Sequence, residues 1–313
     1  MIKLDIHADD YALTINTSKE MLQCMEAGKL DSISIVPNTS VFADSMDMLY
    51  EAIPHLPFLP VMSVHLDFVE GRCLAGVDKA PLLVKEGSDL MGLSWGGVFK
   101  YSYMPGKRSL AKAQLKLEIK AQIARVDEAV KKCLEIAAAN GIACKQKGIR
   151  IDSHQHAHMI PVVWEALTEV IAEEGLEVEY IRNSKEPLLA FVSEVSLWKT
   201  YRPINFVKNR LLAIYSHKVD KYCQAHGMEL MYMWGLIMSG HMDEDRIRKL
   251  YGKISSLAES KGRSLEILFH PGLTLESEVN GEIALDAAED FYMDQGRQVE
   301  YQALMQLDIF NRQ

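Results

Sequence analysis

Short apolar or alternating runs recur along the chain, separated by longer amphipathic segments. The runs predict strands at 2–6, 31–36, 59–64, 148–152, 178–182, 228–234 and 265–269. Between them, apolar residues at helical spacing predict helices, of which the longest covers 109–140 and the last covers 286–307. Strands that alternate with helices in this way predict a parallel sheet with helices on its outside.

Ionisable residues that can bind a metal ion or transfer a proton lie where the predicted strands end. These strand ends carry Asp9, Asp10, His65, Asp67, His154, Arg182, His241 and His270. In a (β/α) barrel the carboxyl ends of the strands meet on one face, where active sites lie. An open doubly wound sheet would not easily bring six strand ends to one point, and no glycine-rich phosphate loop follows the first strand. We therefore predict an α/β fold of the (β/α) TIM-like barrel type, with room for distortion.

Two stretches break the alternation, at about 70–108 and at about 186–205. An irregular run as long as the first is typical of a functional insertion such as a lid. Its scattered aromatic residues suit stacking on sugar faces, and holding the loop in place is an equally good explanation for them. We predict one barrel domain over residues 1–313 that carries these two insertions.

Three histidines at alternate positions follow the strand at 148–152. His154, His156 and His158 would point to one side if the chain stayed extended. Imidazole is a common metal ligand and a proton carrier near neutral pH. This stretch therefore predicts a metal or catalytic site, with a histidine-rich surface turn as the alternative.

Two adjacent carboxylates, Asp9 and Asp10, follow the first strand. Adjacent side chains on an extended chain point in opposite directions, so one carboxylate can bind a metal while the other handles a proton. The alternative is a surface turn, in which aspartate is common.

Composition narrows the class of protein. The chain has 313 residues, 48% of them hydrophobic and 25% charged, which is typical of a globular protein. A net charge of −9 argues against a nucleic-acid partner. Five cysteines without a CxxC pair indicate a reducing compartment. No apolar run approaches the ~20 residues of a membrane span, and the first residues are too charged for a signal peptide. We therefore expect a cytoplasmic protein without a membrane partner.

Several of these motifs together resemble the YdjC-like carbohydrate deacetylases. The resemblance rests on residues 7–11 (HADDY), 64–66 (VHL), 152–158 (DSHQHAH), 239–242 (SGHM) and 266–272 (EILFHPG). Residues 297–304 also look like the C-terminal helix of this family. The chain departs from the family pattern at His7, where asparagine is usual, at Tyr11-Ala12, and in the segment that follows His65.

The resemblance implies a barrel hydrolase that uses a divalent metal ion, magnesium or zinc, to remove acetyl groups from N-acetylated sugars such as chitooligosaccharides. It implies Asp10, His65 and His154 as metal ligands. It also implies Asp9 as the general base and His270 as the acid that protonates the leaving amine. Supporting or substrate-binding positions are then Arg182, His156, His158, Asp67 and His7, whereas the role of His241 is left open.

Two other functions remain as alternatives. An amidohydrolase usually has a His-x-His pair after the first strand, where this chain has Asp9 and Asp10, and a bridging lysine at a strand end. A non-catalytic sugar-binding protein on the same scaffold would lack the base or the acid, yet Asp9 and His270 are both present. The expected partner is a small N-acetylated sugar or oligosaccharide, and the long helix leaves a homodimer as one alternative.

Overall fold

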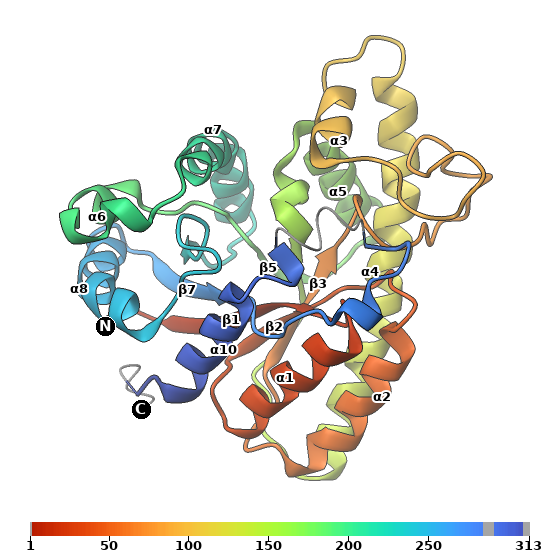
Figure 1. Ribbon diagram of the computed structural model, residues 1–313. Helices are drawn as coiled ribbons and strands as arrows, with labels where there is room; N and C mark the ends of the chain where they lie inside the picture. Colours follow the sequence, from red (N-terminus) through yellow and green to blue (C-terminus); the bar gives the residue numbers. More distant parts are fainter. Residues whose placement is uncertain (1, 284–290, 309–313) are drawn as a thin grey trace.

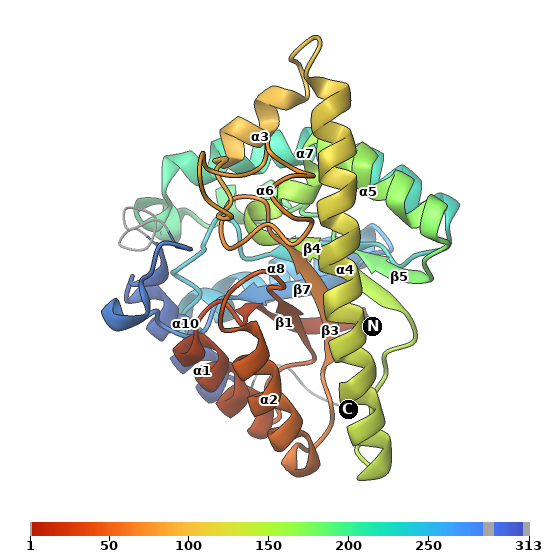
Figure 2. The ribbon, with the colours of Figure 1, turned by 90° about the vertical axis from the view of Figure 1, so that its right-hand side faces the viewer.

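Seven parallel strands form a single sheet in the computed structural model, which describes residues 2–283 and 291–308. The strand order is β5-β4-β3-β2-β1-β7-β6. The strands are β1 (Leu4–Tyr11), β2 (Ser32–Ile35), β3 (Val61–Leu66), β4 (Ile149–Ser153), β5 (Val178–Ile181), β6 (Met231–Trp234) and β7 (Ser264–Phe269). The sheet curls into an incomplete barrel with helices around it (Figures 1 and 2). The predicted α/β barrel-type fold is confirmed in this open form.

The helices flank the sheet and alternate with its strands. They are α1 (Ile15–Glu26), α2 (Phe42–Ala52), α3 (Trp95–Tyr101), α4 (Arg108–Ala139), α5 (Pro161–Glu174), α6 (Leu188–Val192), α7 (Pro203–Ala225), α8 (Glu244–Ser260) and α10 (Gly296–Gln306), with 3-10 turns η1 (Ile53–His55), η2 (His154–Met159), η3 (Val195–Thr200) and η4 (Glu276–Glu278). Helix α4 crosses the whole height of the molecule in Figure 2. Of the helix predicted at 286–307, residues 296–306 form α10, residues 291–295 precede that helix, and residues 286–290 lie outside the described residues.

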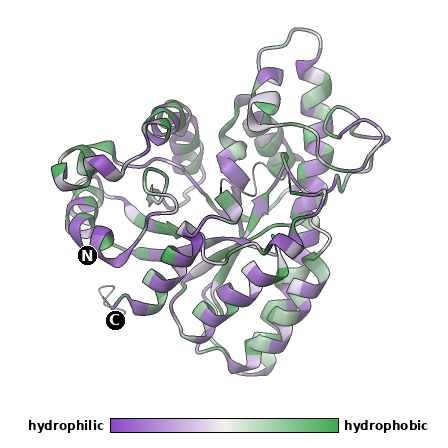
Figure 3. Cartoon of the chain, viewed as in Figure 1, coloured by the Kyte–Doolittle hydropathy of each residue, from purple (hydrophilic) through white to green (hydrophobic). Residues whose placement is uncertain are grey.

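Helix α8 illustrates how the sequence pattern produces this layer. Its buried residues Ile247, Leu250, Ile254 and Ala258 recur at the three- and four-residue spacing of one helical face. Asp243 caps the first turn by accepting a hydrogen bond from the Arg246 backbone N–H at 2.8 Å. Figure 3 shows the helices carrying both hydrophilic and hydrophobic residues, as expected for helices with one buried face. None of the helices in the described part of the chain has the length and apolarity that a bilayer crossing requires.

Strands β5 and β6 are the two edges of the sheet, and contacts at their carboxyl ends bridge the gap between them. The Met233 backbone N–H donates to the Lys185 carbonyl at 3.1 Å. The Glu186 carboxylate accepts hydrogen bonds from three successive backbone N–H groups, those of residues 235, 236 and 237, at 2.8, 3.1 and 2.8 Å. These contacts hold the loop after β6 against the segment after β5, so the incomplete barrel keeps its curvature at the face where the strands end.

The concave side of the sheet is lined with charged and polar residues. Asp5 of β1 accepts a hydrogen bond from Arg150 of β4 at 2.9 Å and another from the Ser32 hydroxyl, and all three side chains are buried. Across the barrel the Tyr180 hydroxyl donates to the Glu266 carboxylate. Strands β1 and β4 are not neighbours in the sheet, so the contact between Asp5 and Arg150 crosses the barrel interior. Mutual pairing is what makes burial of these groups tolerable.

The aromatic residues of the 70–108 stretch pack on one another. Trp95 and Phe99 stack with ring centroids 5.3 Å apart, and Phe99 lies 5.2 Å from Tyr103. The Tyr103 hydroxyl lies 3.3 Å from that of Tyr215 on α7. These contacts join the stretch to α7, so its aromatic side chains act in holding it in place.

Candidate active site

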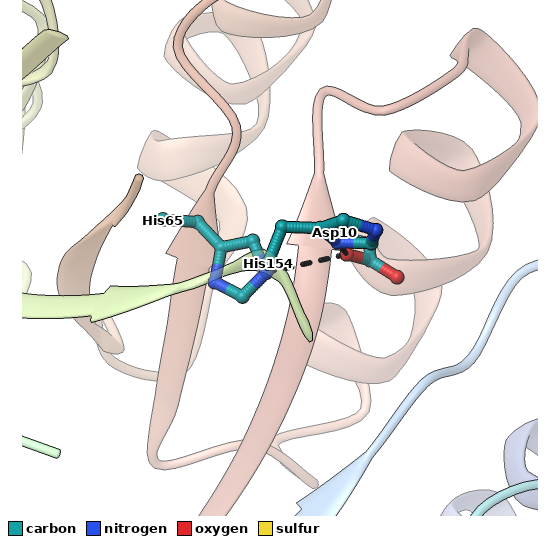
Figure 4. Close-up of side chains that lie close together, drawn as sticks. All are labelled: Asp10, His65 and His154. Atoms are coloured by element: carbon teal, nitrogen blue, oxygen red, sulfur yellow. Dashed lines mark hydrogen bonds and ion pairs between the residues drawn. The ribbon is translucent and has the colours of Figure 1, made fainter. Parts of the chain in front are cut away.

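The carboxyl ends of β1, β3 and β4 bring Asp10, His65 and His154 together (Figure 4). Asp10 Oδ1 lies 3.1 Å from His154 Nδ1 and 3.4 Å from His65 Nε2. The two imidazole rings meet edge to face with centroids 5.6 Å apart. All three side chains are buried, and none is more than 4% exposed. The three residues expected to hold a metal ion therefore form one compact group.

The donor atoms of this group suit a divalent ion. Ligand atoms about 2.0–2.1 Å from a shared ion stand roughly 3.0–3.4 Å from each other, and the two separations at Asp10 Oδ1 fall in that range. The second nitrogen of each imidazole already has a partner. His65 Nδ1 lies 2.6 Å from Asp152 Oδ1, and His154 Nε2 lies 2.5 Å from the Tyr292 hydroxyl. Such partners fix which nitrogen of a histidine faces a metal.

A bulge in β1 brings both aspartates of the pair to the site. The residues of β1 that pair with Ile33 and Ile35 of β2 are Ala8 and Tyr11, so β1 carries one extra residue between the two pairings. Asp10 adopts a left-handed backbone conformation there, with φ of 74°, which aspartate tolerates better than most residues. Bulges re-aim side chains next to active sites. The expectation that adjacent aspartates point in opposite directions does not apply, because the chain is not regularly extended here.

The three histidines after β4 do not point to one side. Gln155 and His156 have φ of 51° and 56°, so the chain turns directly after His154. His158 lies buried, 2.6 Å from the Ser153 hydroxyl and 2.8 Å from the carbonyl oxygen of Arg182. Burial lowers the pKa of His158 to about 4, so this imidazole is neutral. His154 alone of the three joins Asp10, because the turn directs the others elsewhere.

Arg182 holds the other aspartate of the pair. Its guanidinium donates to both oxygens of Asp9 at 2.8 and 2.9 Å. The same group reaches Glu266 at 2.6 Å and Asp152 at 3.4 Å, and it is completely buried. Burial alone would raise the pKa of Asp9, but Arg182 and then His65 hold it well below its usual value. Asp9 therefore remains an ionised carboxylate.

His7 lies behind Asp9 in the barrel interior. Its Nε2 is 2.6 Å from the Ser34 hydroxyl and 3.1 Å from Asp9 Oδ1. Together with Asp152, these residues form a second group of ionisable side chains. The Ser34 hydroxyl also donates to Asp152 at 2.5 Å, and Arg182 already supplies positive charge. Arg182 therefore already balances negative charge in this second group, and the His7 imidazole contacts Asp9 directly.

Two more predicted positions stand further from the cluster. Asp67 Oδ1 accepts the backbone N–H groups of Val69 and Glu70 at 2.9 and 3.1 Å, so it shapes the turn after β3. His156 Nδ1 lies 2.9 Å from the Ser184 hydroxyl. Neither side chain belongs to the group of Asp10, His65 and His154, although the buried Asp67 carboxylate interacts electrostatically with His154.

His270 stands at the end of β7, beside a shallow hollow in the surface. Its backbone N–H donates to Glu300 at 2.6 Å, and its Nδ1 lies 3.5 Å from the same carboxylate. His270 Nδ1 has no hydrogen-bond partner among the described residues. The hollow is lined by Arg202, Ser239, Gly240, His241, His270, Phe291, Asp294, Arg297 and Glu300. His270 and His241 therefore lie side by side along this hollow, and both side chains are partly exposed.

The sequence analysis gave no role to four residues that contact the cluster, namely Asp152, Arg297, Tyr292 and Glu70. Arg297 donates to Asp10 Oδ2 at 2.5 Å, and the Tyr292 hydroxyl lies 2.8 Å from Glu70 Oε2 as well as beside the second nitrogen of His154. The family resemblance included Asp152 and Arg297 in its quoted segments without giving either side chain a role, and it included neither Tyr292 nor Glu70.

The fold and the site define a barrel-type α/β protein with a carboxylate and imidazole cluster at its strand ends. The family model for YdjC-like proteins matches residues 3–133 and 145–311, so the chain belongs to the YdjC-like protein family.

The relatives that the chain matches are named for their activity. A carbohydrate deacetylase of Thermoanaerobacter pseudethanolicus is 26% identical over 186 residues, which are 59% of this chain and 63% of the relative. A carbohydrate deacetylase of Danio rerio is 24% identical over 196 residues, which are 61% of this chain and 52% of the relative. The chain therefore spans less than two thirds of the length of either relative.

A solved structure shares the fold over almost the whole chain. It is a protein of Enterococcus faecalis to which cellobiose-phosphate cleavage has been provisionally assigned. The TM-score is 0.53 with 15% sequence identity, and the alignment covers 97% of this chain and 95% of that one. Similarity at this level concerns the fold alone.

Metal affinity is expected to rise steeply with pH. Burial alone would lower the pKa of His65 and His154, but Asp9, Asp10 and neighbouring carboxylates raise it to about 10 and about 9. Both imidazoles therefore carry a proton at pH 6–8 that a metal ion must displace. We expect zinc affinity to increase at least ~10-fold per pH unit in this range, measured by calorimetry in buffers of different ionisation enthalpy. A pH-independent affinity would contradict the ligand assignment.

Proposed function

We propose that this protein is a metal-dependent deacetylase that removes N-acetyl groups from amino-sugar oligosaccharides of the chitooligosaccharide type. The observation that carries the proposal is the buried cluster of Asp10, His65 and His154 with Asp9 directly beside it. Family membership and the names of the relatives support the same reaction class.

The donor set bears on the choice of metal. One carboxylate and two imidazoles are typical of hydrolytic zinc sites, whereas magnesium prefers oxygen ligands. We therefore propose Asp10, His65 and His154 as the ligands and favour zinc over magnesium. A bound ion would supply Lewis-acid activation of the acetyl carbonyl and of the attacking water.

The side chains around the cluster carry the proton transfers. Asp9 accepts a proton from the attacking water, and Arg182 and His7 keep its carboxylate ionised and oriented. His270 protonates the nitrogen of the amide as its C–N bond breaks, and acetate and a free amine leave. The Glu300 carboxylate lies 3.5 Å from His270 Nδ1, on the side of the imidazole away from this transfer through Nε2.

Acetate release tests the proposal. Incubation with diacetylchitobiose and zinc is expected to release acetate, and a chelator is expected to lower the rate at least ~100-fold, with recovery when zinc is restored. Bound zinc without acetate release would leave the site in place and reject this sugar. Acetate release that a chelator leaves unchanged would reject metal dependence.

A further inference from the structure

We infer that the C-terminal segment 291–300 supports the metal site, because Tyr292 positions the ligand His154 and Arg297 positions the ligand Asp10. Metal binding and packing of this segment against the barrel then stabilise each other. The inference rests on the metal site of the proposed function. It assigns roles to Tyr292 and Arg297, which lie more than a hundred positions from His154 in the sequence.

Tyr292 fixes the orientation of His154. Its hydroxyl lies 2.5 Å from His154 Nε2 and 2.8 Å from Glu70 Oε2, and its ring stacks on the imidazole with centroids 5.9 Å apart. His154 Nε2–H donates to the tyrosine oxygen, which in turn donates to Glu70. This chain of hydrogen bonds directs the other nitrogen, Nδ1, toward Asp10. A phenyl ring at position 292 would fill the same space and leave His154 Nε2–H without its acceptor.

Arg297 divides the two oxygens of Asp10 between two tasks. Its guanidinium donates to Asp10 Oδ2 at 2.5 Å, whereas Oδ1 faces His65 and His154. Arg297 is itself held, because its guanidinium lies 4.8 Å and 5.0 Å from the ring centroids of Phe291 and Tyr292. With Oδ2 occupied, Asp10 is presented to an ion through one oxygen.

Segment 291–300 packs tightly against the rest of the chain. The contacts of Tyr292 and Arg297 with the metal ligands therefore depend on where this segment lies. Gly296 packs against the loop after β6, where a Cβ on Gly296 would stand 2.4 Å from the carbonyl oxygen of Gly240. Glu300 is completely buried and accepts the backbone N–H groups of Gly240 and His270, both at 2.6 Å. The positions of Tyr292 and Arg297 therefore follow from the docking of the whole segment.

Thermodynamic linkage gives this arrangement a measurable consequence. If an ion binds the docked state more tightly than the undocked state, the ion must favour docking by the same factor. Zinc alone, without substrate, is therefore expected to slow amide hydrogen exchange in residues 296–306. Zinc is also expected to raise the melting temperature of the full chain.

Zinc titration of matched tyrosine variants tests the inference. Tyr292→Phe is expected to lower zinc affinity about 10- to 100-fold. Tyr301→Phe is the control, because the Tyr301 hydroxyl on α10 lies 2.6 Å from Gln23 Oε1 and does not contact the site. This variant is expected to bind zinc as the wild type does. Gly296→Ala provides a second approach, since it displaces the segment without touching a ligand, and it is expected to weaken zinc binding and abolish the zinc-dependent slowing of exchange.

The outcomes separate this inference from the proposed function. If wild-type protein binds no zinc, or if Asp10→Asn binds it equally well, the proposed metal site is wrong and the inference is wrong with it. If Asp10→Asn loses zinc while Tyr292→Phe and Gly296→Ala bind it with wild-type affinity, the inference alone is overturned.

Discussion

Asp9→Asn is expected to lower kcat for deacetylation by about 10²- to 10⁴-fold, the usual contribution of a general base. The amide has nearly the shape of the carboxylate but cannot accept the proton of the attacking water. Zinc affinity is expected to stay within about tenfold of wild type, because Asp9 is not one of the three ligands. Acetate release at saturating sugar and a zinc titration of the same preparation measure both quantities.

Asp10→Asn is the matched control, and it is expected to behave in the opposite way, with zinc affinity lost. Asparagine is a better replacement here than alanine, because it also tolerates the left-handed backbone at this position. An Asp9→Asn variant that turns over at the wild-type rate would remove Asp9 as the base, and one that loses zinc would make Asp9 a ligand.

Arg182→Met is expected to reduce the free energy of unfolding by at least about 3 kcal/mol, the scale for removing one partner from a buried ion group. Arg182 is the cation shared by Asp9, Asp152 and Glu266, all of which are buried. Without it, these carboxylates remain inside the barrel with too little positive charge. A methionine side chain fills part of the same space, so the loss reflects charge more than volume.

The pH dependence of this loss identifies its cause. Arg182 lowers the pKa of Asp9 and Asp152 in the folded protein. The ion pairs of these two carboxylates therefore stabilise the folded state fully at pH values above the pKa of an unfolded aspartate, about 4. In Arg182→Met the pKa of both rises, and the folded state gains protons as the pH falls. The difference between the two proteins in free energy of unfolding, measured with urea, should therefore shrink from pH 8 to pH 5.

Arg248→Met is the control, because Arg248 forms an exposed pair with Glu244 on one helix. This variant should lower the free energy of unfolding by less than about 0.5 kcal/mol. An equal loss at both pH values in Arg182→Met would show that packing, not charge, is responsible.

The strands and their order of appearance were predictable because apolar runs mark them clearly. All seven predicted runs became strands of one parallel sheet. The limits of β1 were wrong, since 2–6 was predicted and Leu4–Tyr11 was found. His7 and Asp9 look like loop residues to any hydropathy argument. They lie inside the barrel because Ser32, Ser34 and Arg182 pair with them there, and partners on other strands cannot be read from a local pattern.

The candidate site was predictable in its residue types and less so in its geometry. The sequence places Asp10, His65 and His154 at strand ends, and parallel strands bring those ends together. The bulge in β1 and the turn after His154 depend on backbone conformations that no spacing rule reveals. The contacts of Tyr292 and Arg297 depend on where the last helix docks, which is a tertiary property.

The buried pair of Asp5 and Arg150 has a consequence for how this barrel can change over evolutionary time. Each side chain is the closest charged partner of the other across the interior, so losing one of them alone leaves a buried charge without that partner, whereas losing both together does not. Substitutions at positions 5 and 150 should therefore occur together in evolution. Either both residues become neutral, or the acidic and the basic residue exchange places. An ancestor that passed through either single change would have needed a second mutation nearby to survive it.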